Sequence, residues 1–332
     1  MIEKNMFFKM DNLEFLNLLT KKNAYTPNLT GKIKMIYIDP PYTTGLAFYN
    51  KNGKFAYEDK ENLKDYLKNL KKRLKVAFKL LSDDGAIYIH IDNRISHYVK
   101  IMCDDIFGIE NFRNEIVWCY KTCVQVSKKT FAKNHDTILF YAKPKHQLHI
   151  DRTDFPISES TVKRFGKYAD DKGFVSSKYL SKKGIFNCED DKGFNINYGL
   201  PKDWIEIPTN IARGNNREVI GTKYPTQKPE DLLKIFIKAS SDENDIVLDF
   251  FCGSGTTSIV AEKLNRKWIT CDIGDLSFET FKHRIENIEK TKDLIDNILY
   301  SIDAAGFRNG KNLLQPITIE DKIVQDSDRL DA

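Results

Sequence analysis

The stretch Asp245-Ile-Val-Leu-Asp-Phe-Phe-Cys-Gly-Ser-Gly-Thr-Thr257 decides the fold of this chain of 332 residues. Its apolar first half predicts a buried strand, and Gly253-x-Gly255 predicts a tight turn into a helix. Glycines in such a turn let the backbone approach a ligand closely at the helix N-terminus, where free N–H groups attract an anion. The stretch therefore favours a strand–turn–helix unit that holds a cofactor.

Asp272 is the last residue of the next predicted strand, 17 residues after Gly255. An acid at this place binds the ribose diol in dinucleotide-binding folds. The third glycine of that fingerprint is absent, because Ser258 stands there. A turn of this kind can also be purely structural, but the strand, the helix and the acid together favour a nucleoside cofactor.

Apolar periodicity along the rest of the chain also predicts alternating helices and strands. Helices are expected at residues 60–81, 96–107, 229–239, 256–264 and 276–292, and strands at residues 34–39, 86–91, 115–120, 137–142, 246–250 and 267–272. Strands separated by helices indicate an α/β domain with a mainly parallel sheet. Residues 43–59 are expected to form a long loop, and residues 143–221 an irregular insertion with little core of its own.

The positive charge of the chain is concentrated in its middle third. The formal net charge is +5. Residues 121–230 carry 20 Lys and Arg against 13 Asp and Glu, whereas the remaining residues carry 32 against 34. A solvated surface could account for such a bias, but an insertion that binds a polyanion explains why it is confined to one segment.

Other features of the sequence argue against a membrane protein, a secreted protein and a cysteine-based metal site. No apolar stretch approaches the ~20 residues that span a bilayer, and Glu3, Lys9 and Asp11 interrupt any secretory leader. The six cysteines lack metal-like spacing. We therefore expect reduced thiols, no metal site and a cytoplasmic protein.

Asp39-Pro40-Pro41-Tyr42 ends the apolar run at residues 34–39 and points to a chemistry. Proline fixes φ and donates no hydrogen bond, so this turn neither continues the strand nor starts a helix at once. The carboxylate, the backbone carbonyls and the aromatic ring form a rigid rim. Such a rim suits a planar ring with an exocyclic amino group, whose hydrogens need acceptors and whose face needs a stacking partner. A turn that Asp39 merely caps is the structural alternative.

Two classes of enzyme would use a nucleoside cofactor in this layout, namely nicotinamide dehydrogenases and methyltransferases that use S-adenosylmethionine. No histidine with a matching Asp or Arg stands out as a base for hydride transfer. The tetrapeptide Asp39-Pro-Pro-Tyr42 would also have no role in a dehydrogenase. A methyltransferase accounts for both motifs.

The tetrapeptide at Asp39 and the run Phe251-Cys-Gly-Ser-Gly255 together resemble the motifs of the amino-methylating DNA methyltransferases. The tetrapeptide precedes the glycine motif, with a long segment between them, and this order resembles the β group of that family. Tyr224-Pro-Thr-Gln-Lys-Pro229 is similar to the group's His-Pro-Thr-Gln-Lys-Pro element, with Tyr in place of His.

Residues 36–45 and 134–142 are similar to modification subunits of type III restriction systems, which are typically much longer. The resemblance implies a Rossmann-like methyltransferase fold with a seven-stranded, mostly parallel sheet and a circularly permuted motif order. It divides the chain into a catalytic half, a target-recognition insertion, a cofactor-binding half and a C-terminal extension, at residues 1–142, 143–221, 222–293 and 294–332.

The resemblance also implies roles for individual residues. Asp39, Pro40, Pro41 and Tyr42 would be catalytic. Besides Asp39, the residues that would contact S-adenosylmethionine are Asp11, Thr226, Gln227, Lys228, Phe251, Gly253, Ser254, Gly255, Thr256, Thr257 and Asp272. The candidate DNA contacts in the basic middle third are Lys128, Lys129, Lys182 and Lys183.

These assignments predict a site-specific enzyme that flips an adenine out of double-stranded DNA and methylates its N6 amino group. Tyr42 is the candidate stacking face, and the Asp39 carboxylate and the Pro40 carbonyl would each accept one amino hydrogen. Methylation of cytosine N4 is an alternative, although that branch usually has Ser where Asp39 stands. A DNA-binding partner subunit without catalysis is another. A restriction-endonuclease subunit and a second copy of the chain are further expected partners, with the bacterial nucleoid as the location.

Overall fold

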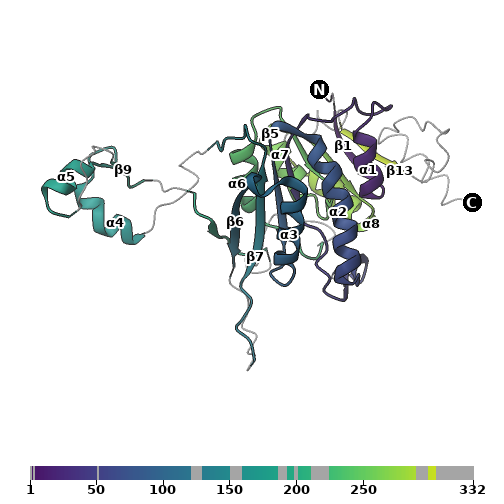
Figure 1. Ribbon diagram of the computed structural model, residues 1–332, viewed down its shortest axis with the longest axis horizontal. Coiled ribbons are helices and arrows are strands. Elements are labelled where there is room, and N and C mark those ends of the chain that lie inside the picture. The colour runs from purple at the N-terminus through teal and green to yellow at the C-terminus, as the bar shows by residue number, and fades with distance from the viewer. Residues whose placement is uncertain are drawn as a thin grey trace, which may run out of the picture. The chain divides into compact units, whose positions relative to one another are not determined.

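The computed structural model describes residues 2, 4–50, 52–120, 129–149, 159–185, 193–197, 201–210 and 224–288, together with the backbone of residues 298–303. The chain divides into two compact units, which we describe separately. The larger unit consists of Met1–Leu148 and Trp204–Ala332, and the smaller unit of His149–Asp203. Figure 1 shows the helices and strands of each.

A nine-stranded sheet forms the centre of the larger unit. Its strands in chain order are β1 (Asn5–Lys9), β2 (Ile33–Ile38), β5 (Leu81–Ile91), β6 (Phe112–Cys119), β7 (His135–Ala142), β10 (Trp204–Glu206), β11 (Ile246–Asp249), β12 (Lys267–Asp272) and β13 (Ile298–Asp303). Across the sheet the order is β10-β6-β7-β5-β2-β11-β12-β1-β13. Among these described strands only β7 runs antiparallel to its neighbours, so the predicted mostly parallel sheet is confirmed.

The sheet differs from the expected seven strands only at its edges. The inner seven strands, from β6 to β1 in sheet order, match the expected sheet in number. β10 and β13 add one strand at each edge, and both pair in parallel with their neighbours. These two strands come from segments that the sequence assigned to the insertion and to the C-terminal extension. β10 has only three residues, too few for periodicity to reveal it.

Helices cover both faces of this sheet. α1 (Asn12–Leu19), α2 (Leu63–Leu80) and α3 (Ser96–Phe107) contribute to one buried apolar cluster, and Figure 1 shows α2 and α3 along the same face. α6 (Glu230–Ser240), α7 (Thr256–Lys263) and α8 (Asp275–Glu286) contribute to the other. A short 3-10 helix, η1 (Ile109–Asn111), leads into β6. The larger unit is therefore a three-layered α/β/α domain.

α2 illustrates how the sequence determines one of these layers. Its buried residues recur every three or four positions and form a single stripe: Tyr66, Leu70, Leu74, Ala77 and Leu80. The side chain of Asn62 caps the helix by accepting the N–H of Asp65 at 3.1 Å. The helix predicted at residues 60–81 is confirmed, with the bounds Leu63–Leu80.

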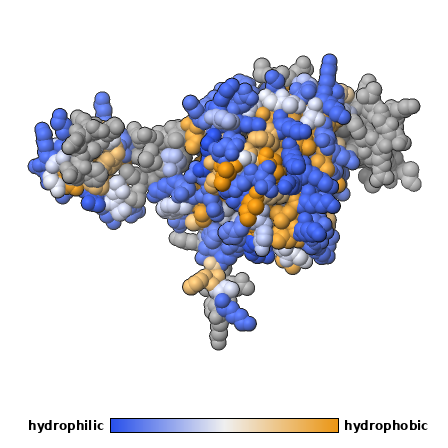
Figure 2. Space-filling view, viewed as in Figure 1, coloured by the Kyte–Doolittle hydropathy of each residue, from blue (hydrophilic) through white to orange (hydrophobic). Residues whose placement is uncertain are grey.

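Hydrophilic side chains predominate on the face that Figure 2 shows, with apolar patches between them.

β2 lies between β5 and β11, although most of the chain separates β2 from β11 in sequence. The register pairs Met35 with Val247 and Ile36 with Leu248. Parallel neighbours end at the same edge of a sheet, which is where ligands bind in open α/β folds. The segment after β2 therefore meets the glycine turn after β11, as the permuted motif order predicts.

The larger unit also differs from the sequence-based expectations at residues 43–59 and 82–85. The predicted long loop at residues 43–59 contains an antiparallel hairpin, β3 (Leu46–Tyr49) and β4 (Phe55–Asp59). Phe48 and Tyr57 stack across it with ring centroids 4.7 Å apart, and such cross-strand pairs stabilise a hairpin. Residues 82–85, expected to separate a helix from a strand, already belong to β5, with a register shift against β2.

The smaller unit contains α4 (Glu159–Phe165), η3 (Gly166–Tyr168), β8 (Phe174–Val175), α5 (Ser177–Lys182) and β9 (Phe194–Asn195). β8 and β9 pair antiparallel. Phe165, Val175 and Leu180 form its small buried cluster. This unit lies inside the expected insertion at residues 143–221, but residues 143–148 and Trp204–Glu206 belong to the larger unit.

Three further observations concern the described residues alone. None of the described helices is long and apolar enough to cross a membrane. No group of three His, Cys, Asp or Glu side chains in the described ranges could hold a metal ion. Cys103, Cys119, Cys252 and Cys271 are free thiols, while the other two cysteines of the sequence lie outside the described residues.

Candidate active site

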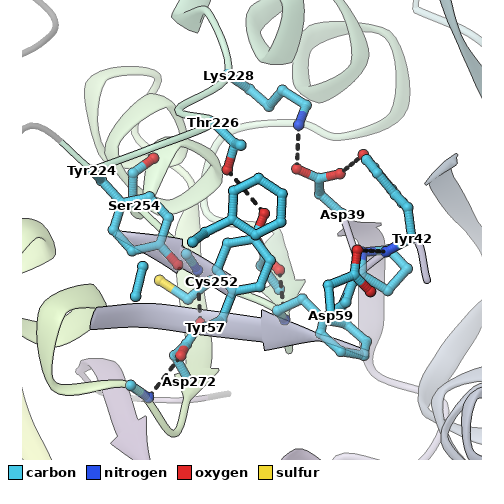
Figure 3. Close-up of a pocket in the computed structure, with 18 of the residues that line it drawn as sticks. Asp39, Tyr42, Tyr57, Asp59, Tyr224, Thr226, Lys228, Cys252, Ser254 and Asp272 are labelled. Carbon is cyan, nitrogen blue, oxygen red and sulfur yellow. Dashed lines mark hydrogen bonds and ion pairs between the residues drawn. The ribbon is translucent and has the colours of Figure 1, made fainter. Parts of the chain in front are cut away.

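A cavity of about 1100 Å³ lies at the carboxyl ends of β2, β11 and β12. Asp39, Tyr42 and Lys228 meet on one side of it, and Figure 3 shows Asp272 at a distance from them. The cavity is lined by all the predicted catalytic and cofactor residues except Gly255, namely Asp11, Asp39, Pro40, Pro41, Tyr42, Thr226, Gln227, Lys228, Phe251, Gly253, Ser254, Thr256, Thr257 and Asp272. Their proximity does not test what each one binds, so the individual roles stay predictions.

The two glycines of the turn after β11 serve different purposes. Gly253 has a φ of +53° and lines the cavity, and its N–H donates to Oδ2 of Asp272 at 2.8 Å. Gly255 has a φ of +78°, and a Cβ atom there would lie only 2.4 Å from Cδ2 of Phe281 on α8. We expected both glycines to let the backbone approach a ligand. The second one also makes room for an aromatic ring of the core, and its contact with a cofactor stays a prediction.

Asp272 holds the glycine turn against the end of β12. Its Oδ2 accepts the N–H of Gly253, and its Oδ1 accepts the N–H of Gly274 at 2.9 Å. Burial raises the pKa of this carboxyl group, while the backbone donors act in the opposite direction. Each carboxylate oxygen has a second lone pair. Asp272 can therefore also accept hydrogen bonds from hydroxyl groups such as those of a ribose.

Asp11 lies at the start of α1 and caps that helix. Its Oδ1 accepts the N–H of Leu13 at 2.8 Å, and its Oδ2 pairs with Arg73 of α2 at 3.0 Å. The N–H of Met10 donates to the backbone oxygen of Asp272 at 3.2 Å, which holds Asp11 beside the end of β12. The capping role of Asp11 is thus visible, and its contact with a cofactor stays a prediction.

Asp249, the last residue of β11, is a cavity-lining residue that sequence reasoning missed. Its carboxylate is buried and accepts hydrogen bonds from Oγ1 of Thr257 at 2.7 Å and from the N–H of Phe251 at 2.9 Å. Burial raises the pKa of Asp249 to about 7, against the opposing effect of those two donors. The available signal was an acid inside an otherwise apolar run.

Asp249→Asn should flatten the pH dependence of stability. The pKa of Asp249 rises from 3.8 to about 7 in the folded protein, so the folded state keeps a proton that the unfolded chain loses. The stabilisation that comes from keeping this proton is therefore complete below about pH 4, and it is lost as the pH rises to about 7. Urea unfolding at about pH 5 and about pH 8 measures the difference. An identical difference in the variant and the wild type would contradict this assignment.

Asp39 follows β2 and has two partners in the cavity. The hydroxyl of Tyr42 donates to Oδ1, and the ammonium group of Lys228 pairs with Oδ2 (Figure 3). Burial, and then the neighbouring Asp39 carboxylate, raise the pKa of Tyr42 well above its usual value. The hydroxyl therefore remains a donor at physiological pH. Pro40 and Pro41 offer no N–H that could compete for the carboxylate.

The ring of Tyr42 stacks on a buried histidine. The ring centroids of Tyr42 and His90 are 6.3 Å apart, and the ring planes differ by 26°. Nδ1 of His90 lies 2.7 Å from the hydroxyl oxygen of Tyr37, and its Nε2 lies 3.3 Å from Oδ2 of Asp136. The predicted stacking ring is thus supported on one side by a hydrogen-bonded side chain, which fixes its orientation.

Asp136 links this network to the other strands that line the cavity. Its Oδ1 accepts the hydroxyl of Tyr120 at 3.2 Å and pairs with Lys133 at 3.0 Å. Burial acts to raise the pKa of Asp136, but His90, Lys228 and Lys133 outweigh it and hold the pKa below its usual range. Asp136 therefore stays ionised. Only its place in the residue 134–142 resemblance could have suggested it from the sequence.

Asp59 at the end of β4 fixes the loop that follows the tetrapeptide. Its carboxylate accepts the backbone N–H groups of Tyr42, Thr43 and Thr44 at 3.0, 2.5 and 3.0 Å. Thr43 has a φ of +55°, a conformation that needs such support in a non-glycine residue. The hairpin β3–β4 thereby positions Tyr42. Sequence reasoning missed this role because it treated residues 43–59 as a loop.

The residues present fit S-adenosylmethionine. Tyr66 lines the cavity, and its hydroxyl is buried and has no hydrogen-bond partner among the described residues. A buried hydroxyl without a partner is costly, so a polar ligand atom would stabilise it. Asp272 offers acceptors for a ribose, and Lys228 offers a cation for a carboxylate. The volume also accommodates a ligand larger than one nucleoside.

Of the four predicted DNA-binding lysines, the structure describes Lys129, Lys182 and Lys183. Lys128 lies outside the described residues. Lys129 is exposed in the larger unit, and Lys182 and Lys183 are exposed in the smaller unit, the first at the end of α5. The ammonium group of Lys183 lies 5.9 Å from the ring centroid of Tyr179. A role in DNA binding stays a prediction for all four residues.

A family model described as DNA methylase matches residues 33–283. Type II methyltransferase M.EcaI of Enterobacter cloacae is 29% identical over 82% of this chain and 67% of its own length. The probable type III restriction-modification enzyme HindVI Mod subunit of Haemophilus influenzae is 26% identical over 88% of this chain. This chain spans only 51% of the length of that subunit.

Among solved structures, the crystal structure of the M1.HpyAVI-SAM complex is similar with a TM-score of 0.52 and 19% identity. The match covers 85% of this chain and 99% of the other. At that identity the likeness establishes the fold and nothing more. It agrees with the α/β/α layers and the sheet described above.

Proposed function

We propose that this chain, which belongs to the DNA methylase family, transfers a methyl group from S-adenosylmethionine to the N6 amino group of an adenine in double-stranded DNA. Because it spans only part of some relatives, the activity of a whole protein of that kind is also part of the proposal. One observation carries it. The Asp39 tetrapeptide and the Gly253 turn lie at the ends of adjacent parallel strands and line the same cavity.

The residues of the cavity suggest how the amino group would be activated. The Asp39 carboxylate and the Pro40 carbonyl each accept one hydrogen of the amino group. This would draw the nitrogen lone pair out of conjugation with the ring and direct it at the methyl group. The new N–C bond would form as the bond between sulfur and methyl breaks, the neutral thioether S-adenosylhomocysteine would leave, and the amino group would lose one proton to water. S-adenosylmethionine, when bound, supplies that methyl group on a sulfonium centre. Asp39 also stabilises the positive charge that develops on nitrogen, so catalysis depends on positioning and electrostatics.

The choice of adenine rests on the aspartate at position 39. The family includes methylases of adenine N6 and of cytosine N4. The resemblance indicates that the cytosine branch usually has Ser where Asp39 stands.

Adenine must also leave the helix to expose its amino group, which costs a few kcal/mol. Tyr42, held by His90 and Asp59, offers a preorganised surface on which the flipped base would stack.

Mass spectrometry of nucleosides from methylated DNA tests this proposal. The purified chain is incubated with S-adenosylmethionine and unmethylated duplex DNA, which is then digested to nucleosides. We expect N6-methyl-2′-deoxyadenosine and no N4-methyl-2′-deoxycytidine. The cytosine product alone would replace the adenine assignment by the cytosine one. Neither product, with the cofactor bound, would favour a DNA-binding partner subunit without catalysis.

Replacing both lysines of the smaller unit, Lys182→Gln with Lys183→Gln, should weaken DNA binding and reduce its dependence on salt. Each phosphate contact contributes about 0.9 to the slope of log K against log salt. Loss of two contacts should therefore reduce the slope by about 2. Fluorescence anisotropy with labelled duplex at several salt concentrations measures it. The matched control replaces the exposed pair Lys21 and Lys22 of the larger unit by glutamine. Equal slopes for both double variants would argue against a DNA contact at α5.

The partners of the chain also belong to the proposal. The similarity to a type III Mod subunit supports a restriction-modification system and a nuclease subunit as one partner. A second copy of the chain is the other proposed partner. Binding to chromosomal DNA would place the protein on the nucleoid.

A further inference from the structure

Lys228 and Asp39 form an ion pair inside the cavity. The side chain of Lys228 is 11% exposed and that of Asp39 is 22% exposed, so water screens the pair only partly. The ammonium nitrogen of Lys228 also lies 5.8 Å from the ring centroid of Tyr42. Figure 3 shows Lys228 and Tyr42 on opposite oxygens of the Asp39 carboxylate. The proposed catalytic carboxylate is thus held by two donors of the chain itself.

This ion pair conflicts with the role proposed for Asp39. Positive charge develops on the amino nitrogen during methylation, and a carboxylate beside it stabilises that charge. An ammonium group on the same carboxylate offsets its negative charge and brings a second positive charge near the reacting nitrogen. Lys228 should therefore leave Asp39 before the methyl group is transferred. In this respect the inference rests on the proposed function.

The backbone of Lys228 is fixed close to the glycine turn. Oγ1 of Thr256 donates to the backbone oxygen of Lys228 at 3.2 Å, and Nδ2 of Asn210 donates to the same oxygen at 3.3 Å. Thr256 is the first residue of α7, directly after Gly255. The side chain thus starts at the cofactor end of the cavity and reaches Asp39. Rotation about its own bonds is enough to move the ammonium group.

The other cations that line the described part of the cavity have carboxylate partners elsewhere. Lys54 pairs with Glu279, and Arg73 pairs with Asp11. Lys133 pairs with the buried Asp92 and Asp136.

Asp136, whose pKa Lys228 helps to lower, already accepts Tyr120 and Lys133 and contacts His90. It therefore has little need of a further cation. A carboxylate that enters with the cofactor is a better alternative partner for Lys228.

We propose that Lys228 is a positioning residue that moves from Asp39 to the carboxylate of bound S-adenosylmethionine, and that this move frees Asp39 for the target amino group. The cofactor and Asp39 thus compete for one ammonium group. Cofactor binding and the readiness of the catalytic carboxylate are coupled through it. A target base that bound before the cofactor would meet an Asp39 carboxylate whose negative charge is still offset by Lys228.

Calorimetric binding of two cofactor analogues tests the competition without any turnover. S-adenosylhomocysteine carries the carboxylate, and 5′-methylthioadenosine lacks the amino-acid end. Lys228→Gln should weaken S-adenosylhomocysteine binding about 10-fold and leave methylthioadenosine binding unchanged, and Lys228→Arg should restore most of the loss. The matched control is Lys133→Gln, because Lys133 lines the same cavity but pairs with other carboxylates. It should change the ratio of the two affinities little.

The decisive measurement is a double-mutant cycle between Lys228 and Asp39. In the otherwise wild-type chain, Asp39→Asn should strengthen S-adenosylhomocysteine binding several-fold, because Lys228 no longer has to leave a carboxylate. In the Lys228→Gln background the same substitution should have no effect. A gain that persists in that background would mean that Asp39 simply repels the cofactor's carboxylate, and it would overturn the proposal.

These binding results are independent of the base that is methylated. The expected cycle together with cytosine as the methylated base would refute the proposed adenine specificity and leave the role of Lys228 intact. Adenine methylation with equal effects of Lys228→Gln on both analogues would refute the role of Lys228 alone. Absence of binding for both analogues in every variant would overturn the cofactor assignment and this inference together.

Discussion

Asp39→Ala should abolish methyl transfer to DNA while cofactor binding persists. Removal of a single preorganised charge-stabilising group typically costs a factor of about 10²–10³ in kcat. Asp39 combines that role with acceptance of an amino hydrogen, so we expect a loss of about 10³-fold or more. Transfer of a labelled methyl group to duplex DNA measures the rate, and calorimetry with S-adenosylhomocysteine measures whether the cofactor site is intact.

Two further variants define what the loss at position 39 means. Asp39→Asn keeps an acceptor oxygen but removes the charge, so its rate should also be strongly reduced, though less than that of the alanine variant. Asp83→Ala is the control, because Asp83 is an exposed aspartate at the start of β5 that pairs only with Lys145 in a salt bridge among the described residues. Turnover of Asp39→Ala close to that of Asp83→Ala would refute the catalytic assignment.

Gly255→Ala should be the most destabilising single substitution in the glycine turn. The new Cβ atom would lie 2.4 Å from Cδ2 of Phe281, and the φ of +78° disfavours any side chain. Overpacking of a core costs about 1–3 kcal/mol, and a left-handed conformation at a non-glycine residue costs about 1–2 kcal/mol. The free energy of unfolding should therefore fall by about 2–5 kcal/mol. Urea denaturation followed by circular dichroism measures it.

Gly31→Ala separates the two causes of that loss. Gly31 has a φ of +69°, and a Cβ atom there would have no neighbouring atom within 4 Å, so this substitution introduces backbone strain without a clash. It should cost about 1–2 kcal/mol. Gly253→Ala should be similar, because the nearest atom to its new Cβ, Cε1 of Tyr224, would be 3.6 Å away. Equal losses at Gly31 and Gly255 would show that the ring of Phe281 adapts to the extra methyl group.

The parts of the site that the sequence predicts are those encoded within a few consecutive residues. The turn at Gly253 and the rim at Asp39 each follow a strand directly, so local spacing identifies them. Their meeting also follows, because parallel strands end at one edge and the permuted order makes β2 and β11 neighbours. The fold class and the family are also confirmed, because both were predicted from motifs and periodicity within short segments.

The parts that sequence reasoning missed depend on contacts between distant segments. Asp59 supports the loop after the tetrapeptide only because β3 and β4 form a hairpin, and polar and glycine residues made that segment resemble a loop. His90 supports Tyr42 from another strand. The clash that requires Gly255 involves Phe281 on α8. Periodicity within one element gives no information on such partners.

The position of β2 beside β11 has a consequence for the order in which the protein folds. The antiparallel pairs β5–β7 and β6–β7 join strands that lie close together in the chain, and local contacts of this kind form quickly. The pair of β2 and β11 closes a loop that includes the whole smaller unit, so its entropic cost delays it. During synthesis the Asp39 tetrapeptide therefore emerges long before its neighbouring strand. The chain should become able to bind its cofactor only in the last stage of folding.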